Sequence, residues 1–170
     1  MAFEIVPHEL TSALQRSADR RAGFGEPLYY RTETTSTNDD AARLADAGAS
    51  HGTTVVAAAQ TSGRGRLGRT WFSPPDAGLY VSVIIREPRA ARLLTLAGGV
   101  AVAEGVRAAA ALPAEIKWPN DVVVDSGLGK RRKLAGILTE ASTGPEGLQF
   151  VVIGFGINLL PAAYPMPALA

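Results

Sequence analysis

One stretch of the chain contains most of its chemical information: residues 60–72 read Gln-Thr-Ser-Gly-Arg-Gly-Arg-Leu-Gly-Arg-Thr-Trp-Phe. We call it the arginine–glycine loop. Its glycines let the backbone fold around a ligand while three arginines direct guanidinium groups into the same small space. Guanidinium groups bind phosphate oxygens in pairs, and bare glycine amides add N–H donors. The loop therefore predicts a site for a phosphate-bearing ligand, although by itself it is equally typical of a solvated basic surface loop.

The loop glycines at 63, 65 and 68 also spell Gly-x-Gly-x-x-Gly, the pattern of dinucleotide-binding folds. In those folds the pattern follows a strand and opens a helix that packs closely on it. A strand-like run, residues 53–60, does precede the loop. Residues 70–75 include two consecutive prolines and cannot begin a long helix. The downstream sequence therefore argues against a Rossmann fold.

The composition limits the chemistry that is open to the chain. Its 170 residues include no cysteine and two histidines, which excludes thiolate nucleophiles and the usual zinc sites. Any catalysis must use carboxylates, lysines, arginines, hydroxyl groups or a hard cation. The net charge of +1 makes the basic character local, which argues against general binding of nucleic acid. The size fits one domain with a substantial core.

The sequence also bears on location. The amino-terminal residues lack a basic region followed by an apolar stretch, so no secretory signal is expected. The longest apolar stretch, residues 93–112, is interrupted by Glu104 and Arg107, which is typical of a buried helix and not of a membrane span. We therefore expect a cytoplasmic protein.

Hydrophobic periodicity and turn residues predict an α+β domain. Helices are expected at residues 8–21, 38–47 and 90–111, and the hydroxyl groups of residues 34–37 are expected to cap the second one. Strands are expected at residues 28–32, 53–59, 78–85, 115–118, 121–124, 133–140 and 148–157. Three glycines inside the third helix predict close packing on the sheet: Gly98, Gly99 and Gly105.

Two short segments place polar residues at the ends of apolar elements, where side chains converge on pockets. Ser36-Thr37-Asn38 offers hydroxyl and amide groups to a ligand, although helix capping explains the same residues more simply. Lys117-Trp118-Pro119-Asn120-Asp121 offers a lysine to phosphate and an aspartate to a hard cation. An ordinary turn whose lysine and aspartate form a salt bridge explains the same residues.

Two later strands have a similar character. Lys133 enters a strand that contains Gly136, where another group can approach the backbone closely. The charge run at residues 130–133 is typical of a solvated hairpin and does not match a P-loop. Residues 153–158 form an apolar strand with two glycines, which suggests a flat ligand lying on bare backbone.

In this order, the five segments closely resemble the biotin protein ligase family over about residues 28–160. Relatives that attach lipoate share the fold but differ at the arginine–glycine loop. The resemblance implies a mixed, largely antiparallel sheet with helices packed on it, of the class II synthetase type. It also divides the chain into an N-terminal helix and linker, residues 1–27, and a catalytic domain, residues 28–170, that is incomplete at its C-terminal end.

The activity that the resemblance implies is that of an ATP-dependent biotin–[acetyl-CoA-carboxylase] ligase. Such enzymes join biotin to ATP as biotinyl-5'-AMP with release of pyrophosphate, then transfer biotin to a lysine of a biotin carboxyl carrier protein. The substrates would be biotin and ATP, with Mg2+ as cofactor. About thirty residues precede the matching run, too few for the repressor domain of some relatives, so no DNA binding is expected. A homodimer stays open.

The resemblance assigns roles to individual residues. The implied catalytic residues are Lys133, Arg64 and Lys117, and Asp121 is the implied Mg2+ ligand. The implied biotin contacts are Ser36, Thr37, Asn38, Gln60, Arg64, Gly65, Arg66, Lys133 and Gly136. The implied contacts to ATP and the adenylate are Gly63, Arg64, Arg69, Trp71, Lys117, Asn120, Gly154, Gly156 and Asn158.

The composition of the arginine–glycine loop predicts its mobility, and three other functions are compatible with the sequence. The loop is rich in glycine and positive charge and poor in apolar residues, so it should be mobile when empty and ordered by a charged ligand. The alternatives are a lipoate-type ligase, a truncated module that binds biotin or nucleotide without turnover, and nucleic-acid binding through the basic segments.

Overall fold

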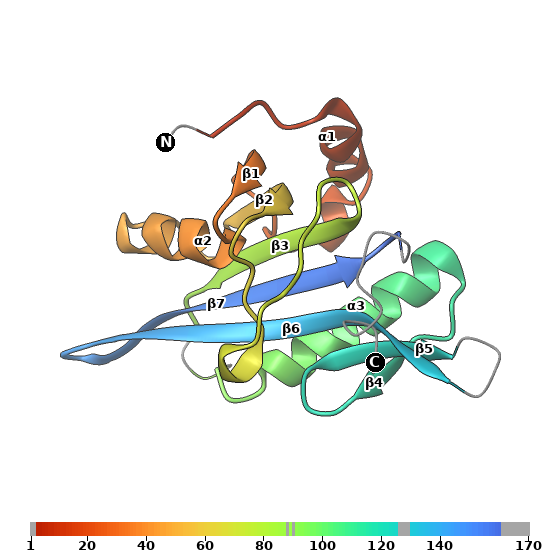
Figure 1. Ribbon diagram of the computed structural model, residues 1–170. Coiled ribbons are helices and arrows are strands. Elements are labelled where there is room, and N and C mark those ends of the chain that lie inside the picture. Colours follow the sequence, from red (N-terminus) through yellow and green to blue (C-terminus); the bar gives the residue numbers. More distant parts are fainter. Residues whose placement is uncertain (1–2, 88, 90, 126–129, 161–170) are drawn as a thin grey trace.

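The computed structural model describes residues 3–87, 89, 91–125 and 130–160. Seven strands of this described part form one sheet in the order β1-β2-β3-β7-β6-β5-β4 (Figure 1). Only β1 and β2 run parallel among these pairs, and the other neighbours are antiparallel. The expected mixed, largely antiparallel sheet is therefore confirmed. The strands are β1 (Leu28–Thr34), β2 (Thr54–Gln60), β3 (Gly78–Ile85), β4 (Glu115–Lys117), β5 (Asp121–Asp125), β6 (Arg131–Gly144) and β7 (Gly147–Asn158).

Three α-helices and two short 3-10 helices accompany the sheet in the described residues. The α-helices are α1 (His8–Gln15), α2 (Thr37–Asp46) and α3 (Leu94–Ala110), and the 3-10 helices are η1 (Ala18–Arg20) and η2 (Arg66–Gly68). Within the described part of the chain, no helix combines the length and apolar character that crossing a membrane requires.

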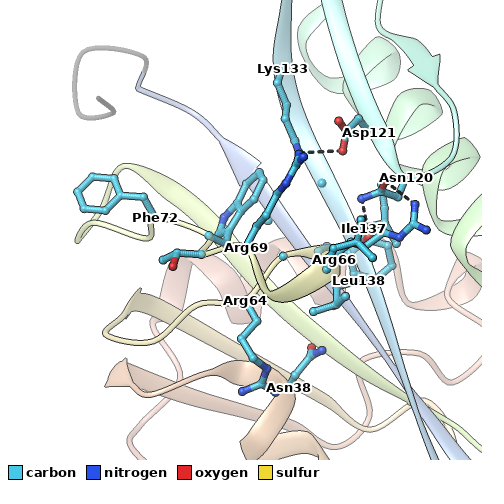
Figure 2. A pocket seen from close by; sticks show the side chains of 18 of the residues that line it. Asn38, Arg64, Arg66, Arg69, Phe72, Asn120, Asp121, Lys133, Ile137 and Leu138 are labelled. Atoms are coloured by element: carbon cyan, nitrogen blue, oxygen red, sulfur yellow. Dashed lines mark hydrogen bonds and ion pairs between the residues drawn. The ribbon is translucent and has the colours of Figure 1, made fainter. Parts of the chain in front are cut away.

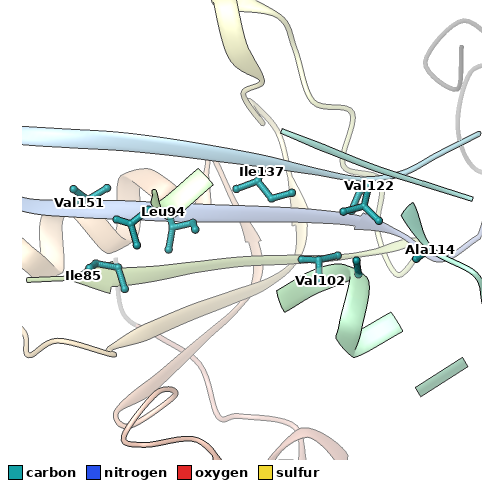
Figure 3. Packing of buried hydrophobic residues seen from close by; sticks show 10 residues of the cluster. Ile85, Leu94, Val102, Ala114, Val122, Ile137 and Val151 are labelled. Atoms are coloured by element: carbon teal, nitrogen blue, oxygen red, sulfur yellow. The ribbon is translucent and has the colours of Figure 1, made fainter. Parts of the chain in front are cut away.

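The central strand β7 separates two hydrophobic cores. Successive side chains of a strand point to opposite faces. Val151 and Ile153 belong to the core that contains α3, whereas Phe150 and Val152 belong to the core that contains α2. Figure 3 shows the core that contains α3, in which Leu94 and Val102 of this helix pack on the sheet. The even-numbered residues of β7 therefore face α2.

The same alternation runs through the neighbouring strand β6. Ala135 and Ile137 pack in the core under α3, so Gly136, Leu138 and Glu140 face the other way. Because Gly154 and Gly156 of β7 share that face, polar and glycine positions of both strands collect on the α2 side of the sheet. This side holds the cleft described below.

The expected elements agree with the structure except at particular positions. The first helix ends at Gln15, and residues 18–20 form a 3-10 turn. The hydroxyl cap of the second helix is wrong: Ser36 is the N-cap residue, but its side chain makes no capping hydrogen bond within the described residues. The third helix begins at Leu94 and not at residue 90, because residues 91–93 form a turn, and β6 extends beyond the expected residues 133–140 at both ends. Residues 88, 90, 126–129 and 161–170 lie outside the described residues.

The glycines of α3 behave differently from one another. A Cβ atom added to Gly98 would lie 2.7 Å from Ile153 Cδ1, so close packing is confirmed there. At Gly99 the nearest atom would be an ordinary 3.8 Å away. Gly105 meets nothing within 4 Å among the described atoms, so the expectation is wrong for that position.

Candidate active site

A cleft of about 510 Å³ opens on the α2 side of the sheet. Its walls come from the arginine–glycine loop, the start of α2, the turn between β4 and β5, and the strands β6 and β7 (Figure 2). The structure thus brings together segments from most of the length of the chain. The residues singled out in the sequence that line this cleft are Ser36, Thr37, Asn38, Gln60, Arg64, Gly65, Arg66, Arg69, Trp71, Lys117, Asn120, Asp121, Lys133, Gly136, Gly154, Gly156 and Asn158.

Gly63 is the one residue of the expected set outside this lining. It is buried, and its carbonyl oxygen accepts a hydrogen bond of 2.8 Å from the Trp71 amide. An added Cβ atom would overlap the Trp71 carbonyl oxygen. Gly63 therefore shapes the base of the loop.

A chain of polar side chains forms one wall of the cleft. Gln60 Oε1 accepts hydrogen bonds from the amide and hydroxyl groups of Thr37 at 2.9 and 3.1 Å. Gln60 Nε2 donates to Ser73 Oγ at 2.8 Å, which ties the wall to the far end of the loop. The buried Ser82 hydroxyl lies 2.7 Å from Thr37 Oγ1 and 2.6 Å from Asn38 Oδ1. These bonds fix the orientation of both amide groups.

The three loop arginines reach different partners. Arg64 donates hydrogen bonds to two carboxylates, those of Asp39 and Glu140. These bonds, the Asp39 bond foremost, raise the pKa of the Arg64 guanidinium above its ordinary value. Arg66 Nη1 donates to the neutral Asn120 Oδ1 at 3.2 Å. The described part of the chain supplies no hydrogen-bond or ion-pair partner for the Arg69 side chain.

The expectation that three guanidinium groups share one small space is met only in part. All three arginines line the cleft. However, the Arg64 side chain points toward Asn38, whereas the Arg66 side chain reaches Asn120 (Figure 2). The uncompensated positive charge of the loop therefore lies at Arg69 and Arg66 and not at Arg64.

Lys133 and Asp121 face each other inside the cleft. Lys133 Nζ lies 2.8 Å from Asp121 Oδ1, and both side chains are mostly buried. The ammonium group also lies 5.0 Å from the centre of the Trp71 ring, a cation–π contact. The Lys117 side chain is exposed at the rim, and no described residue forms an ion pair or hydrogen bond with it. Asp121 is thus paired with Lys133 of β6, and within the described residues the turn's own Lys117 forms no ion pair with it.

Glycines of the two central strands admit the protein's own side chains. A Cβ atom on Gly136 would lie 2.8 Å from the Trp71 ring, and one on Gly156 would overlap the indole nitrogen. A Cβ atom on Gly154 would overlap the Asn38 amide oxygen. The sequence suggested a flat ligand on the backbone of these glycines. In this structure the flat group is the Trp71 ring, which covers Gly156, and the Asn38 amide covers Gly154.

Three polar atoms of the cleft are buried without a hydrogen bond to the described residues: Trp71 Nε1, Asn158 Oδ1 and Asp121 Oδ1. Of these, Asp121 Oδ1 has an ion-pair partner in Lys133. Asn158 uses its other end, because Nδ2 donates to the Lys133 carbonyl oxygen at 3.2 Å. Buried polar atoms normally have a partner. A donor and an acceptor thus remain for a bound molecule.

The fit to a magnesium ion rests on one carboxylate. Among the described residues, no three acidic or histidine side chains gather closely enough to hold a metal ion. Mg2+ in nucleotide sites commonly takes one or two carboxylates and completes its coordination with phosphate oxygens and water. The Asp121 carboxylate fits that limited role once its ion pair with Lys133 is broken.

Residues 28–158 match the biotin/lipoate A/B protein ligase family. The chain belongs to this family. It is 37% identical over 156 residues to the bifunctional ligase/repressor BirA of Bacillus spizizenii, covering 90% of the chain and 46% of the relative. It is 39% identical over 135 residues to the biotin–[acetyl-CoA-carboxylase] ligase of Paracoccus denitrificans, covering 76% of the chain and 53% of the relative. The chain thus spans about half the length of these curated relatives.

Solved structures confirm the family fold. The biotin protein ligase of Aquifex aeolicus in complex with biotin and ATP superposes with a TM-score of 0.68 at 34% identity, over 83% of this chain and 56% of that one. The Leishmania major biotin protein ligase in complex with biotinyl-5-AMP gives a TM-score of 0.62 at 32% identity, over 77% and 56% of the two chains. The expected catalytic-domain fold of this family is confirmed.

Sequence reasoning missed several residues that shape the site. Asp39 and Glu140 bind Arg64, and Ser73 and Ser82 complete the polar wall. Glu140 lies two residues after Leu138 on β6 and therefore points to the same face, that of the cleft. This alternation is the one feature of the sequence that could have placed Glu140 near the site. The pairing of either carboxylate with Arg64 leaves no local pattern in the sequence.

Proposed function

We propose that the chain activates biotin with ATP as a biotin protein ligase and passes the biotinyl group to a lysine of a biotin carboxyl carrier domain. The observation on which this depends is the gathering of separate motif segments on one cleft with uncompensated cations. The names of the relatives support the chemistry, since they include biotin ligases and complexes with biotin, ATP or biotinyl-5-AMP.

In the first step, a carboxylate oxygen of biotin attacks the α-phosphorus of ATP. The bond from that phosphorus to the bridging oxygen breaks, and pyrophosphate leaves with both electrons. Attack of an anion on a triphosphate is slowed by repulsion, so the main catalytic task is neutralisation and alignment. Arg69, Lys117 and Arg66 are the cations best placed for this task, because no described carboxylate neutralises them.

Lys133 would neutralise the reacting carboxylate. Its ammonium group rests between Asp121 and the face of Trp71, so an incoming carboxylate can replace one anionic partner with another. Asp121 would then be free to take part in holding Mg2+, which would add positive charge beside the phosphates. The unpartnered Trp71 Nε1 and Asn158 Oδ1 would bind acceptor and donor atoms of the nucleotide.

In the second step, the acceptor lysine attacks the acyl carbon as a neutral amine. The new C–N bond forms while the bond to the AMP oxygen breaks, and the amine loses a proton. The carrier domain as partner, a homodimer and a cytoplasmic location stay predictions.

The test is a direct assay of the first step. The protein is mixed with biotin, ATP and Mg2+, and pyrophosphate and biotinyl-5'-AMP are measured. We expect both products, dependent on biotin and not supported by lipoate. Tight biotin binding without pyrophosphate would identify a binding module instead, and activity with lipoate would identify the other branch of the family.

A variant locates the reacting carboxylate. Lys133→Ala should lower adenylate formation by at least about tenfold, since a hydrogen bond to a charged group contributes about 1.5–3 kcal/mol. Arg132→Ala, one residue earlier on β6, removes a positive charge outside the cleft lining and is the matched control. Unchanged adenylate formation in Lys133→Ala would show that the carboxylate lies elsewhere.

A further inference from the structure

The protein's own carboxylates occupy most of the hydrogen-bond donors of Arg64. Its Nη1 and Nη2 atoms donate to Asp39 at 3.0 and 2.7 Å, and its Nε and Nη2 atoms donate to Glu140 at 3.2 and 3.0 Å. An arginine has five N–H donors. Four hydrogen bonds to carboxylates leave one donor for any other molecule.

Glu140 has a second role at the same place. Its Oε2 atom also accepts a hydrogen bond from Asn38 Nδ2. Asn38 Oδ1 in turn faces the hydroxyl group of the fully buried Ser82. One carboxylate therefore sets the orientation of a cleft amide and holds a loop arginine.

The cluster ties three separate elements together at the foot of the loop. Asp39 comes from the first turn of α2, Glu140 from the cleft face of β6, and Arg64 from the loop. A second hollow of about 640 Å³ lies along the loop, and both Arg64 and Glu140 line it. Arg64 lines both hollows, as do most residues of the loop between Arg64 and Thr70.

We propose that Asp39 and Glu140 are positioning residues for biotin activation: they anchor the arginine–glycine loop over the cleft through Arg64, and Glu140 also orients Asn38. This inference rests on the proposed function. It assigns Arg64 to holding the loop and leaves direct neutralisation of the substrates to Arg66, Arg69, Lys117 and Lys133.

The exposure of the cluster distinguishes positioning from a general contribution to stability. The Arg64, Asp39 and Glu140 side chains are 39%, 37% and 40% exposed. Ion pairs that solvent reaches to this degree contribute little to global stability. A local tie of this kind instead limits how far the loop moves, which governs how often a ligand meets a complete cleft.

Three charge-neutral variants test the anchor in the whole chain. Glu140→Gln and Asp39→Asn keep the size of each side chain and remove its charge. Glu115→Gln is the matched control, since it breaks the exposed Arg131–Glu115 pair outside the cleft lining. Hydrogen exchange of the ligand-free protein is followed at the Gly65 and Trp71 amides, which donate to Arg69 O and Gly63 O inside the loop.

We expect exchange at these two amides to be about three- to tenfold faster in Glu140→Gln and Asp39→Asn and unchanged in Glu115→Gln. The melting temperature of all three should stay within about 2 °C of the unaltered protein. Biotin affinity, measured by titration calorimetry, should weaken by a similar factor in the first two variants. Asp39→Asn should add nothing in an Arg64→Ala background, because its effect passes through Arg64.

The outcomes separate this inference from the proposed function. Unchanged exchange in both cleft variants would overturn the anchor, and faster exchange with unchanged biotin affinity would overturn its positioning role. If the variants behave as expected but even the unaltered protein releases no pyrophosphate with biotin and ATP, the anchor stands and the proposed function fails.

Discussion

At the scale of single residues, the cations of the cleft differ in what already neutralises them. Arg64 faces two carboxylates and Lys133 faces one. Arg66 faces a neutral amide. Arg69 and Lys117 face no partner within the described residues. Because a bound phosphate competes with existing partners, the affinity of each cation for a ligand should rise in this order.

Arg69→Ala tests this order. We expect the kcat/KM for ATP in the pyrophosphate assay to fall about 10- to 100-fold, because a hydrogen bond to a charged group contributes about 1.5–3 kcal/mol. The free energy of unfolding should change by less than about 0.5 kcal/mol, since an exposed side chain without a protein partner is removed. Arg132→Ala controls for the loss of charge. Equal kinetics for ATP in both variants would contradict the assignment.

Gly156→Ala tests the seat of Trp71. The added methyl group overlaps the indole nitrogen, so the ring must leave β7 and its contact with Lys133. Overpacking of this kind costs about 1–3 kcal/mol of stability. Gly105→Ala in α3 is the matched control: its methyl group meets open space, and it should stabilise the helix by up to about 1 kcal/mol. Urea unfolding measures both, and equal midpoints would refute the tight seat.

At the scale of elements, the sequence predicted what local patterns encode. Each of the seven strands was anticipated, because alternation and turn residues are local signals. The cleft lining was anticipated from the resemblance to a family. The sequence did not predict which group packs on the glycines of β7. A glycine indicates that some group approaches the backbone closely but not which one, and at Gly156 this group is Trp71 from a loop distant in the sequence. The pairing of Arg64 with Glu140 is likewise a consequence of the tertiary fold.

The arginine–glycine loop gives the prediction at this scale. Its tip, η2, is exposed, with Leu67 90% accessible and in a left-handed conformation. Among the described residues, this tip is held by backbone hydrogen bonds between Gly65, Arg66 and Arg69 and by the side-chain bonds of Arg64 and Arg66. Biotin together with ATP should therefore slow amide exchange at residues 63–69 by about tenfold or more, because a charged ligand adds contacts that the empty loop lacks.

Two controls accompany this exchange measurement. The Val55 amide in the buried strand β2 should be unaffected by ligands. Inorganic phosphate alone should slow the loop amides less than biotin and ATP, because it cannot fill the polar wall. Exchange at residues 63–69 that ignores both substrates would show that ligand charge does not order the loop.

At the scale of the whole molecule, the cleft joins early and late parts of the chain. Ser36 and Asn158 line the same space, together with residues from β5 and β6. A ligand that bridges these elements binds the folded chain and not the unfolded one. Its binding free energy therefore adds to the free energy of unfolding of the entire domain.

Ligands at 100 times their Kd should stabilise the chain by about 2.7 kcal/mol. For a domain of this size that corresponds to a rise in Tm of about 5–10 °C, measured by calorimetry with biotin and a non-hydrolysable ATP analogue. Inorganic triphosphate is the control, because it presents the charge without the biotin or adenine groups. A chain that merely binds polyanions through its basic segments would gain equally from triphosphate, would lose the gain steeply with salt, and would not respond to biotin. The net charge of +1 argues for the first pattern, since it gives the chain no strong overall attraction for polyanions.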